Sequence, residues 1–419
     1  MITHTHKVRP ACAAVVLSIL ALAPLTGCNT SPAPARVCEG VRLVSVNGAT
    51  LYSQARTYYT GIRILDLQGK PLEQEMNNVM RLLDGAITND PKCALFQTKM
   101  ADMQMEAGQV QAAGSAYEQT RQLCEDWVPA WIGMAHVSTR KGDLDSARNY
   151  LRGATASLNQ IQGAAKPLED VPDFWSALGL NIPRQKQPDK SPNDPSLSDD
   201  ESLQLLVNHL QESEAWTIEN PGLLIQGQGG VSQVQPGKLF RRVHARIEYH
   251  YALIELQAGT GPDAVLAKLD RSLEWDPDFF PAKIEKAAQF RLSGKLQEAE
   301  RLLRPYLDSA DPKLSNNGRL LYEMAGIYTD WYVKEKDTQL ADRADAYFSK
   351  LHTLNPKHAE GFVKRAELYL ATGTALKRND ILDNAITCVN HARTIRGSDT
   401  PEATKLRADI AKAKAAIGS

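Results

Sequence analysis

The sequence predicts an all-α fold, an α-α superhelix of stacked helical hairpins with an irregular proline-rich insertion. Three observations predict it. In residues 128–161, apolar and small side chains recur three and four positions apart, in two sets separated by Lys141-Gly142-Asp143. Residues 94–127 carry a similar pattern 34 residues earlier (128 − 94 = 34). From Gly163 to Pro195 six prolines interrupt the pattern, and proline cannot continue a long helix.

The segment 128–161 reads as two helices, because Gly142 can end one helix and Asp143 can begin the next. Its pattern is Trp-x2-Met-Ala-x2-Ser…Ala-x3-Leu-x2-Ala, and it resembles the tetratricopeptide (TPR) consensus. Alanine at 135 and 147 fits a close crossing of two helix backbones.

The amino terminus, residues 1–27, reads as an export signal with an apolar run too short to span a membrane. It ends in Leu-Thr-Gly-Cys28, which resembles the lipobox of bacterial lipoproteins. That resemblance implies lipid attachment at Cys28, with acyl chains such as palmitate mooring the chain to a membrane. Asn29 then favours an outer-membrane lipoprotein facing the periplasm. A free cysteine after a cleaved signal is the alternative, and residues 28–36 read as a tether.

Composition offers no attraction for nucleic acid, since 48 basic and 49 acidic residues leave a net charge of −1 and no basic run occurs. We therefore expect no nucleic-acid partner.

The rest of the chain divides into regions by pattern. Residues 37–162 form an N-terminal TPR-like region, in which Val41 to Val46 alternates weakly like a short strand. Residues 163–240 form the insertion, with one helix predicted after the capping box at 198–201. We expect other residues to pack over Trp216, because a large apolar side chain in a linker is otherwise exposed. Residues 241–398 form a C-terminal TPR-like region. There the pattern of 321–351 recurs 41 residues later, which predicts hairpins longer than the 34-residue ones. Residues 399–419 predict a polar capping helix.

The cysteines allow one predicted bridge. Cys93 precedes one helix and Cys124 lies near the end of its antiparallel partner, so both should lie at the same end of a hairpin. We expect either a Cys93–Cys124 disulfide or two buried thiols.

No arrangement of residues points to catalysis. His244 and Glu248 share a helix face, but no third ligand is visible, so we interpret them as an exposed ion pair. The sequence therefore predicts no catalytic residue, no metal site and no cofactor, with an unrecognised hydrolase as a remote alternative.

The TPR resemblance implies that the first helices of the pairs line a concave groove, which in relatives binds an extended peptide or a helix. By that resemblance the partner-binding positions here are the following: Thr98, Asp102, Met105, Glu106, Ile132, His136, Thr139, Arg140, Ile284 and Arg291.

Two functions remain open from the sequence. The first is a membrane-anchored scaffold that mediates protein–protein interaction in envelope assembly or secretion, with an unidentified envelope protein or peptide segment as partner. The second is a ligand-capture lipoprotein, in which residues 163–240 fold over the groove and enclose a small molecule or glycan.

Overall fold

The computed structural model describes residues 38, 40–64, 69–165, 199–214, 216–217 and 236–418. The predicted signal, Cys28, the tether and most of the insertion lie outside these residues. Within them, no helix combines the length and apolar character that a membrane span requires.

The described residues form an all-α structure, and the fold-class prediction is confirmed. The helices up to the insertion are α1 (Val46–Ile64), α2 (Gly69–Asn89), α3 (Ala94–Glu106), α4 (Val110–Leu123), α5 (Val128–Lys141) and α6 (Leu144–Ala165). The helices from the insertion to the middle of the C-terminal region are α8 (Asp199–Glu214), α9 (Pro236–Ala258), α10 (Pro262–Trp275), α11 (Phe280–Leu292), α12 (Leu296–Leu307) and α13 (Pro312–Ser315). The remaining helices are α14 (Gly318–Glu335), α15 (Thr338–Leu354), α16 (Ala359–Leu376), α17 (Asn379–Arg396) and α18 (Pro401–Gly418).

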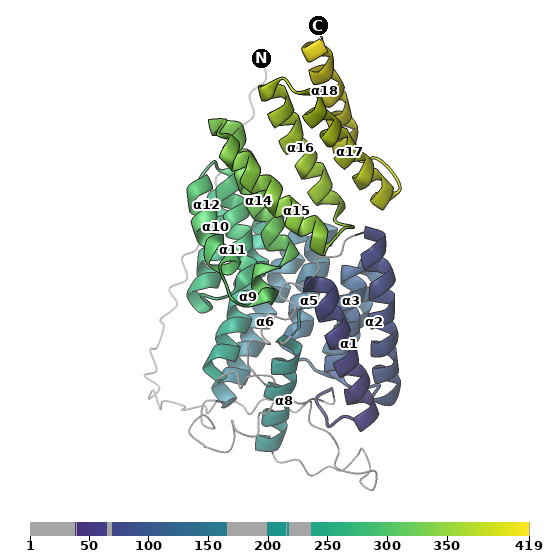
Figure 1. The fold of residues 1–419 in the computed structure, drawn as a ribbon. Helices are drawn as coiled ribbons and strands as arrows, with labels where there is room; N and C mark the ends of the chain where they lie inside the picture. The colour runs from purple at the N-terminus through teal and green to yellow at the C-terminus, as the bar shows by residue number, and fades with distance from the viewer. Residues whose placement is uncertain are drawn as a thin grey trace, which may run out of the picture. The chain divides into compact units, whose positions relative to one another are not determined.

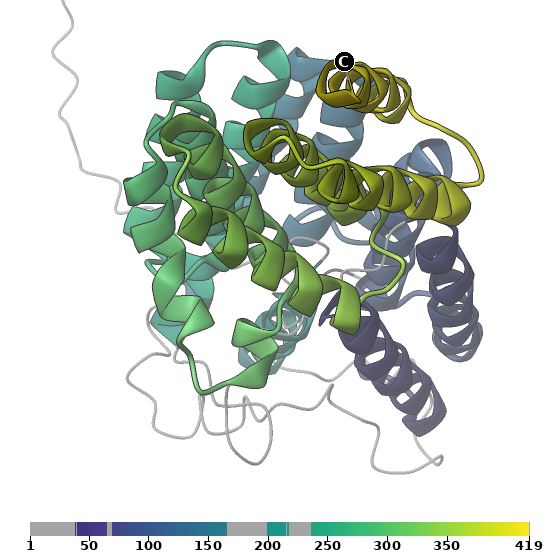
Figure 2. The same ribbon diagram turned by 45° about the horizontal axis from the view of Figure 1, so that its top comes forward.

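The helices are antiparallel pairs that stack in chain order, as Figures 1 and 2 show from purple to yellow. Each helix packs mainly on the helix before and after it, which is how a solenoid buries its apolar surface. Helix α9 packs on α5 and α6, so the stack resumes there after the insertion. Buried side chains form neighbouring hydrophobic clusters from Val41 to Ile410.

Helix lengths confirm the change of repeat. The pair α11–α12 has helices of 13 and 12 residues, whereas α14 and α15 have 18 and 17. The turns also differ: Gly142 ends α5 in the left-handed region, but Lys336 and Lys377 hold that conformation in the long hairpins. The predicted capping helix is α18, which packs on α16 and α17.

The strand prediction for Val41 to Val46 is wrong. The chain there is an extended segment that ends where α1 begins. Its Gly40 donates an N–H to the Leu123 carbonyl and accepts from the Ala94 N–H, at 3.1 and 2.8 Å. The buried residues of this segment, Val41 and Val44, are three positions apart, so the weak alternation does not correspond to a buried strand face.

The predicted Cys93–Cys124 bridge is also wrong. Cys124 is bonded to Cys38, with the two Cα atoms 4.9 Å apart, and Cys93 is a buried free thiol. The cause is the same extended segment, because its backbone hydrogen bonds at Gly40 hold it against the end of the α3–α4 hairpin. Burial raises the pKa of the Cys93 thiol to about 12, so this thiol stays protonated.

Candidate functional site: a helix held in the concave groove

The first helices of the N-terminal pairs hold the chain's own α8 and the two residues described after it. Helix α8 packs on α3, α5 and α6 (Figure 1). The side chains that donate hydrogen bonds to α8 and Trp216 come from α1, α3 and α9, which are the first helices of their pairs. A segment of the insertion therefore packs on helices that the sequence predicts to line a groove, and we call the surface of α1, α3, α5, α6 and α9 that holds it the groove.

Helix α8 is buried although it is polar. From residue 202 to 214 every side chain except that of Gln204 is buried. A helix buried on all sides is normally apolar all round. The buried polar residues of this helix are Ser202, Asn208, His209, Gln211, Glu212, Ser213 and Glu214. The groove thus holds a helix that buries these polar residues together with five apolar ones, which are Leu203, Leu205, Leu206, Val207 and Leu210.

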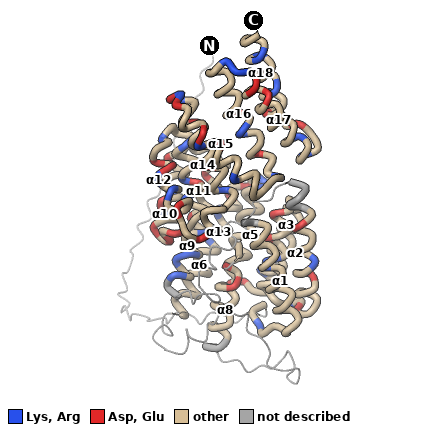
Figure 3. Tube along the Cα trace, in the orientation of Figure 1, with Lys and Arg blue, Asp and Glu red and all other residues tan. Residues whose placement is uncertain are grey.

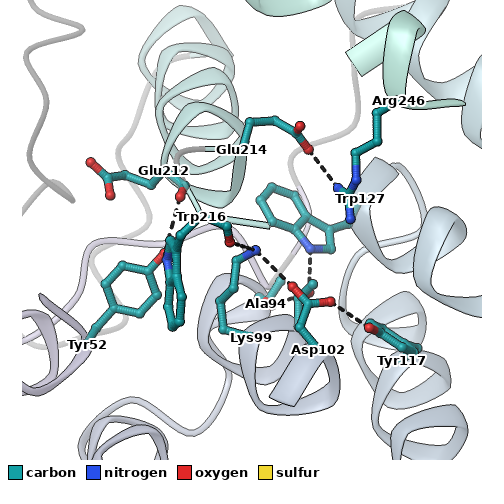
Figure 4. Close-up of polar contacts among 11 residues, drawn as sticks. Tyr52, Ala94, Lys99, Asp102, Tyr117, Trp127, Glu212, Glu214, Trp216 and Arg246 are labelled. Carbon is teal, nitrogen blue, oxygen red and sulfur yellow. Dashed lines mark hydrogen bonds and ion pairs between the residues drawn. The ribbon is translucent and has the colours of Figure 1, made fainter. Parts of the chain in front are cut away.

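Lys99 of α3 is the centre of this recognition (Figure 4). Its side chain is fully buried, and its Nζ donates to Asp102 Oδ2 at 2.9 Å and to the Trp216 carbonyl at 2.8 Å. The ammonium also lies 5.4 Å from the centre of the Trp216 ring. A buried ammonium needs both a counter-charge and hydrogen bonds, and Lys99 obtains one from the groove and one from the inserted segment.

Asp102 is held in position by Tyr117, whose ring packs against Gly133. Tyr117 of α4 donates its hydroxyl to Asp102 Oδ1 at 2.5 Å. The Tyr117 ring lies against Gly133 of α5, where an added Cβ would come within 2.3 Å of a ring carbon. Glycine at 133 is therefore required for the ring to reach this position, and the ring in turn orients the carboxylate.

Two further ion pairs hold the carboxyl-terminal end of α8. Arg56 of α1 lies 2.8 Å from Glu212 Oε2, and Arg246 of α9 lies 2.8 Å from Glu214 Oε1. Both carboxylates are at most 5% exposed. Three basic side chains from three first helices thus face two carboxylates and one backbone carbonyl of the inserted segment.

Trp216 fills the space beside these pairs. It is fully buried, its indole N–H donates to the Tyr52 hydroxyl at 2.7 Å, and its ring packs on Tyr52 and Tyr59. The Tyr52 hydroxyl donates to the Glu212 carbonyl at 3.4 Å. Burial, and then the nearby Glu212 charge, raise the pKa of Tyr52 well above its ordinary value, so the phenol remains a donor.

Burial also shifts two groups on α8 itself. It lowers the pKa of His209 to about 4 and raises the pKa of Glu212 to about 6, the latter against the opposing effect of Arg56. Neutral histidine is the form that this site favours at neutral pH.

Two of the predicted groove residues of the N-terminal region, Thr98 and Asp102, belong to this cluster of contacts. Thr98 is buried and accepts a hydrogen bond from the Trp127 indole at 2.7 Å, and Asp102 is the partner of Lys99. Met105 and Ile132 are buried, Glu106, His136 and Thr139 are half-buried, and Arg140 is exposed.

The two predicted groove residues of the C-terminal region are engaged within the solenoid. Ile284 is buried in the core. Arg291 reaches from α11 to α14, where it pairs with Glu323 at 3.3 Å and Asp330 at 2.9 Å. Figure 3 shows acidic and basic residues interspersed along the helices, in keeping with such pairing.

The predicted ion pair between His244 and Glu248 is wrong. His244 is buried and stacks on Trp275 with ring centres 4.2 Å apart, and Glu248 instead pairs with Lys268 at 3.6 Å. Within the described ranges, no group of three or more His, Cys, Asp or Glu residues is placed to hold a metal ion.

Comparison with solved structures finds helical-repeat proteins. A tetratricopeptide repeat protein from Parabacteroides merdae is 13% identical, with a TM-score of 0.40 over 87% of this chain and 99% of that one. The TPR domain of P58(IPK) is 14% identical, with a TM-score of 0.24 over 82% and 94%. The human IFIT1 dimer with PPP-AAAA is 14% identical, with a TM-score of 0.31 over 87% and 89%.

The stacked helical hairpins and the 34-residue step between α3–α4 and α5–α6 decide the classification. The fold is TPR-like. No family profile and no curated protein matches the chain.

Sequence reasoning missed the residues that hold α8. Lys99, Arg56 and Arg246 are spread over three helices, and Trp216 lies 117 positions after the lysine that it contacts. The one available signal was Glu212-x-Glu214-x-Trp216, because two carboxylates and an indole in a short polar stretch need partners when buried.

Proposed function

We propose that the protein is a membrane-anchored TPR-like scaffold lipoprotein, which holds a protein partner during envelope assembly or secretion. Helix pairs of this kind build extended concave binding surfaces. One observation carries the proposal: the groove holds a 16-residue helix through two ion pairs with buried glutamates, Glu212 and Glu214, and through the buried Trp216 that follows the helix. A surface that holds a helix of its own chain has the chemistry to hold a helix of another. Binding, rather than catalysis, is the proposed activity.

The membrane part of the proposal comes from the lipobox resemblance at Cys28. Two or more acyl chains on one residue anchor a protein stably, and this chain would then work within a tether's reach of the bilayer. Growing cells with labelled palmitate should label the wild-type protein, whereas Cys28→Ser should abolish labelling and move the protein to the soluble fraction.

Site-specific photo-crosslinking in living cells tests the scaffold role. The crosslinker is placed at Arg140, an exposed residue of α5 at a predicted groove position, and the control crosslinker at Arg152, an exposed residue of the second helix α6. We expect a reproducible crosslinked protein from position 140 and not from 152. The same set of proteins from both positions, or none from either, contradicts the scaffold role.

The ligand-capture alternative receives one specific support, because part of the insertion does lie in the groove. However, the buried helix occupies the space that a small molecule would need. A thermal-shift screen of sugars and other periplasmic solutes separates the two functions, since only the alternative predicts a ligand-dependent rise in melting temperature.

A further inference from the structure

The fit between α8 and its groove is incomplete, and this bears on what else the groove binds. The His209 ring nitrogens, the Gln211 amide nitrogen and the Ser213 hydroxyl are buried without a hydrogen-bond partner in the described part of the chain. His209 and Ser213 are fully buried, and Gln211 is 6% exposed. An unpaired buried polar group destabilises the arrangement that buries it, because its hydrogen bonds to water are lost and not replaced.

The well-made contacts of the same segment lie at other positions. Glu212, Glu214 and Trp216 each have a matched partner in Arg56, Arg246 and Tyr52. The Trp216 carbonyl is matched as well, by the Lys99 ammonium. The groove is therefore complementary to an acidic-x-acidic-x-tryptophan sequence, and it is poorly complementary to the polar residues at 209, 211 and 213.

We propose that this groove is a recognition site for an acidic partner helix ending in Glu-x-Glu-x-Trp, and that residues 202–217 are a replaceable resident ligand. The partner helix carries apolar side chains where α8 carries His209, Gln211 and Ser213. This inference rests on the proposed scaffold function and names the chemistry of the partner.

The resident segment has one advantage over a partner. It belongs to the same chain, which raises its effective concentration at the groove. Connectors of 33 residues (198 − 165) and 18 residues (235 − 217) separate it from α6 and α9. A partner must therefore bind with a higher intrinsic affinity, and replacing unpaired polar groups with apolar ones supplies that difference.

Binding of labelled synthetic peptides to the full-length chain in detergent tests the proposal. The native peptide has the sequence of residues 199–217. The improved peptide carries His209→Leu, Gln211→Leu and Ser213→Ala. We expect the improved peptide to bind at least about tenfold more tightly, as measured by fluorescence anisotropy.

A charge exchange between chain and peptide shows where the peptide binds. Arg56→Glu in the chain opposes residue 212 of the resident segment and of the improved peptide with a like charge, so it weakens both of them. A peptide that also carries Glu212→Arg should therefore bind the Arg56→Glu chain at least about tenfold more tightly than the improved peptide does. Arg56 is partly exposed, so this variant keeps the fold more readily than a change at Lys99. Arg378→Glu, at an exposed ion pair on the C-terminal region, is the control that should leave binding unchanged.

Equal affinity of the native and improved peptides, or a Glu212→Arg peptide that binds the Arg56→Glu chain no better than the improved peptide does, overturns the proposal. Dimers of the wild-type chain that dissociate on adding the improved peptide would assign the groove to a second copy and overturn the partner assignment. If the peptides fail while the crosslink from position 140 persists, the scaffold function stands and only this inference falls.

Discussion

Replacing Lys99 with methionine tests whether a buried charge pair holds the inserted segment. Methionine keeps most of the side-chain volume and removes the ammonium. Asp102, 2% exposed, is then left charged in the core. Removing one partner of a buried pair costs about 3–5 kcal/mol. Because Tyr117 still donates to Asp102 at 2.5 Å, we expect the lower end, a loss of about 3 kcal/mol in the free energy of unfolding.

The double variant Lys99→Met/Asp102→Leu removes both charges and should recover part of that loss. The coupling energy between the two sites should be about 1–3 kcal/mol. Urea unfolding followed by tryptophan fluorescence measures Lys99→Met, Asp102→Leu and the double variant, and Trp216 packs directly on the site. Lys414→Met, which breaks an exposed pair with Asp383, is the control and should change stability by less than about 0.5 kcal/mol. A Lys99→Met change as small as that of the control, or additive single and double variants, would refute the buried-pair account.

Two further predictions concern the disulfide and pH. The Cys38–Cys124 bridge closes a separation of 86 residues, so Cys38→Ala should lower the free energy of unfolding by about 4–5 kcal/mol and make the melting temperature insensitive to reductant. A wild-type melting temperature that reductant leaves unchanged would contradict the bridge. The pKa of His209 is lower in the folded chain than in the unfolded chain, so this residue lowers the free energy of unfolding as pH falls from 6.5 to 4. The pKa of Glu212 is higher in the folded chain, so this residue raises the free energy of unfolding as pH falls from about 6 to 4.5. Glu212→Gln keeps only the His209 contribution, so its free energy of unfolding should fall by about 2 kcal/mol between pH 7 and pH 5. His209→Leu keeps only the Glu212 contribution, so its free energy of unfolding should rise by about 1 kcal/mol over the same range, as measured by urea unfolding at both pH values. Identical pH responses of the two variants would contradict these assignments.

The repeat architecture was predictable because it depends on local spacing. Ala135 and Ala147 fit a close helix crossing, and the 41-residue recurrence of the pattern around Ala325 and Ala366 predicts the longer hairpins. These signals lie within one or two helices, where sequence distance and spatial distance agree.

The occupied groove was not predictable in the same way. The predicted groove positions include Thr98 and Asp102, yet the residue between them in sequence, Lys99, makes the contact with the inserted segment. The partner of Lys99 lies 117 residues away, and no periodic pattern links the two positions. The disulfide failed for a similar reason, since the extended segment that carries Cys38 to Cys124 has no helical period to follow.

Native-state hydrogen exchange of α8 tests the central claim most directly, because it reports whether that helix is held in the groove of the intact chain. Because the groove holds α8, the amides of residues 203–214 should be protected from exchange in the wild type. In Lys99→Met they should exchange faster, while the amides of α14 and α15 keep their protection. Amides of α8 that exchange in the wild type as fast as those of an unfolded peptide would contradict the claim that the groove holds this helix.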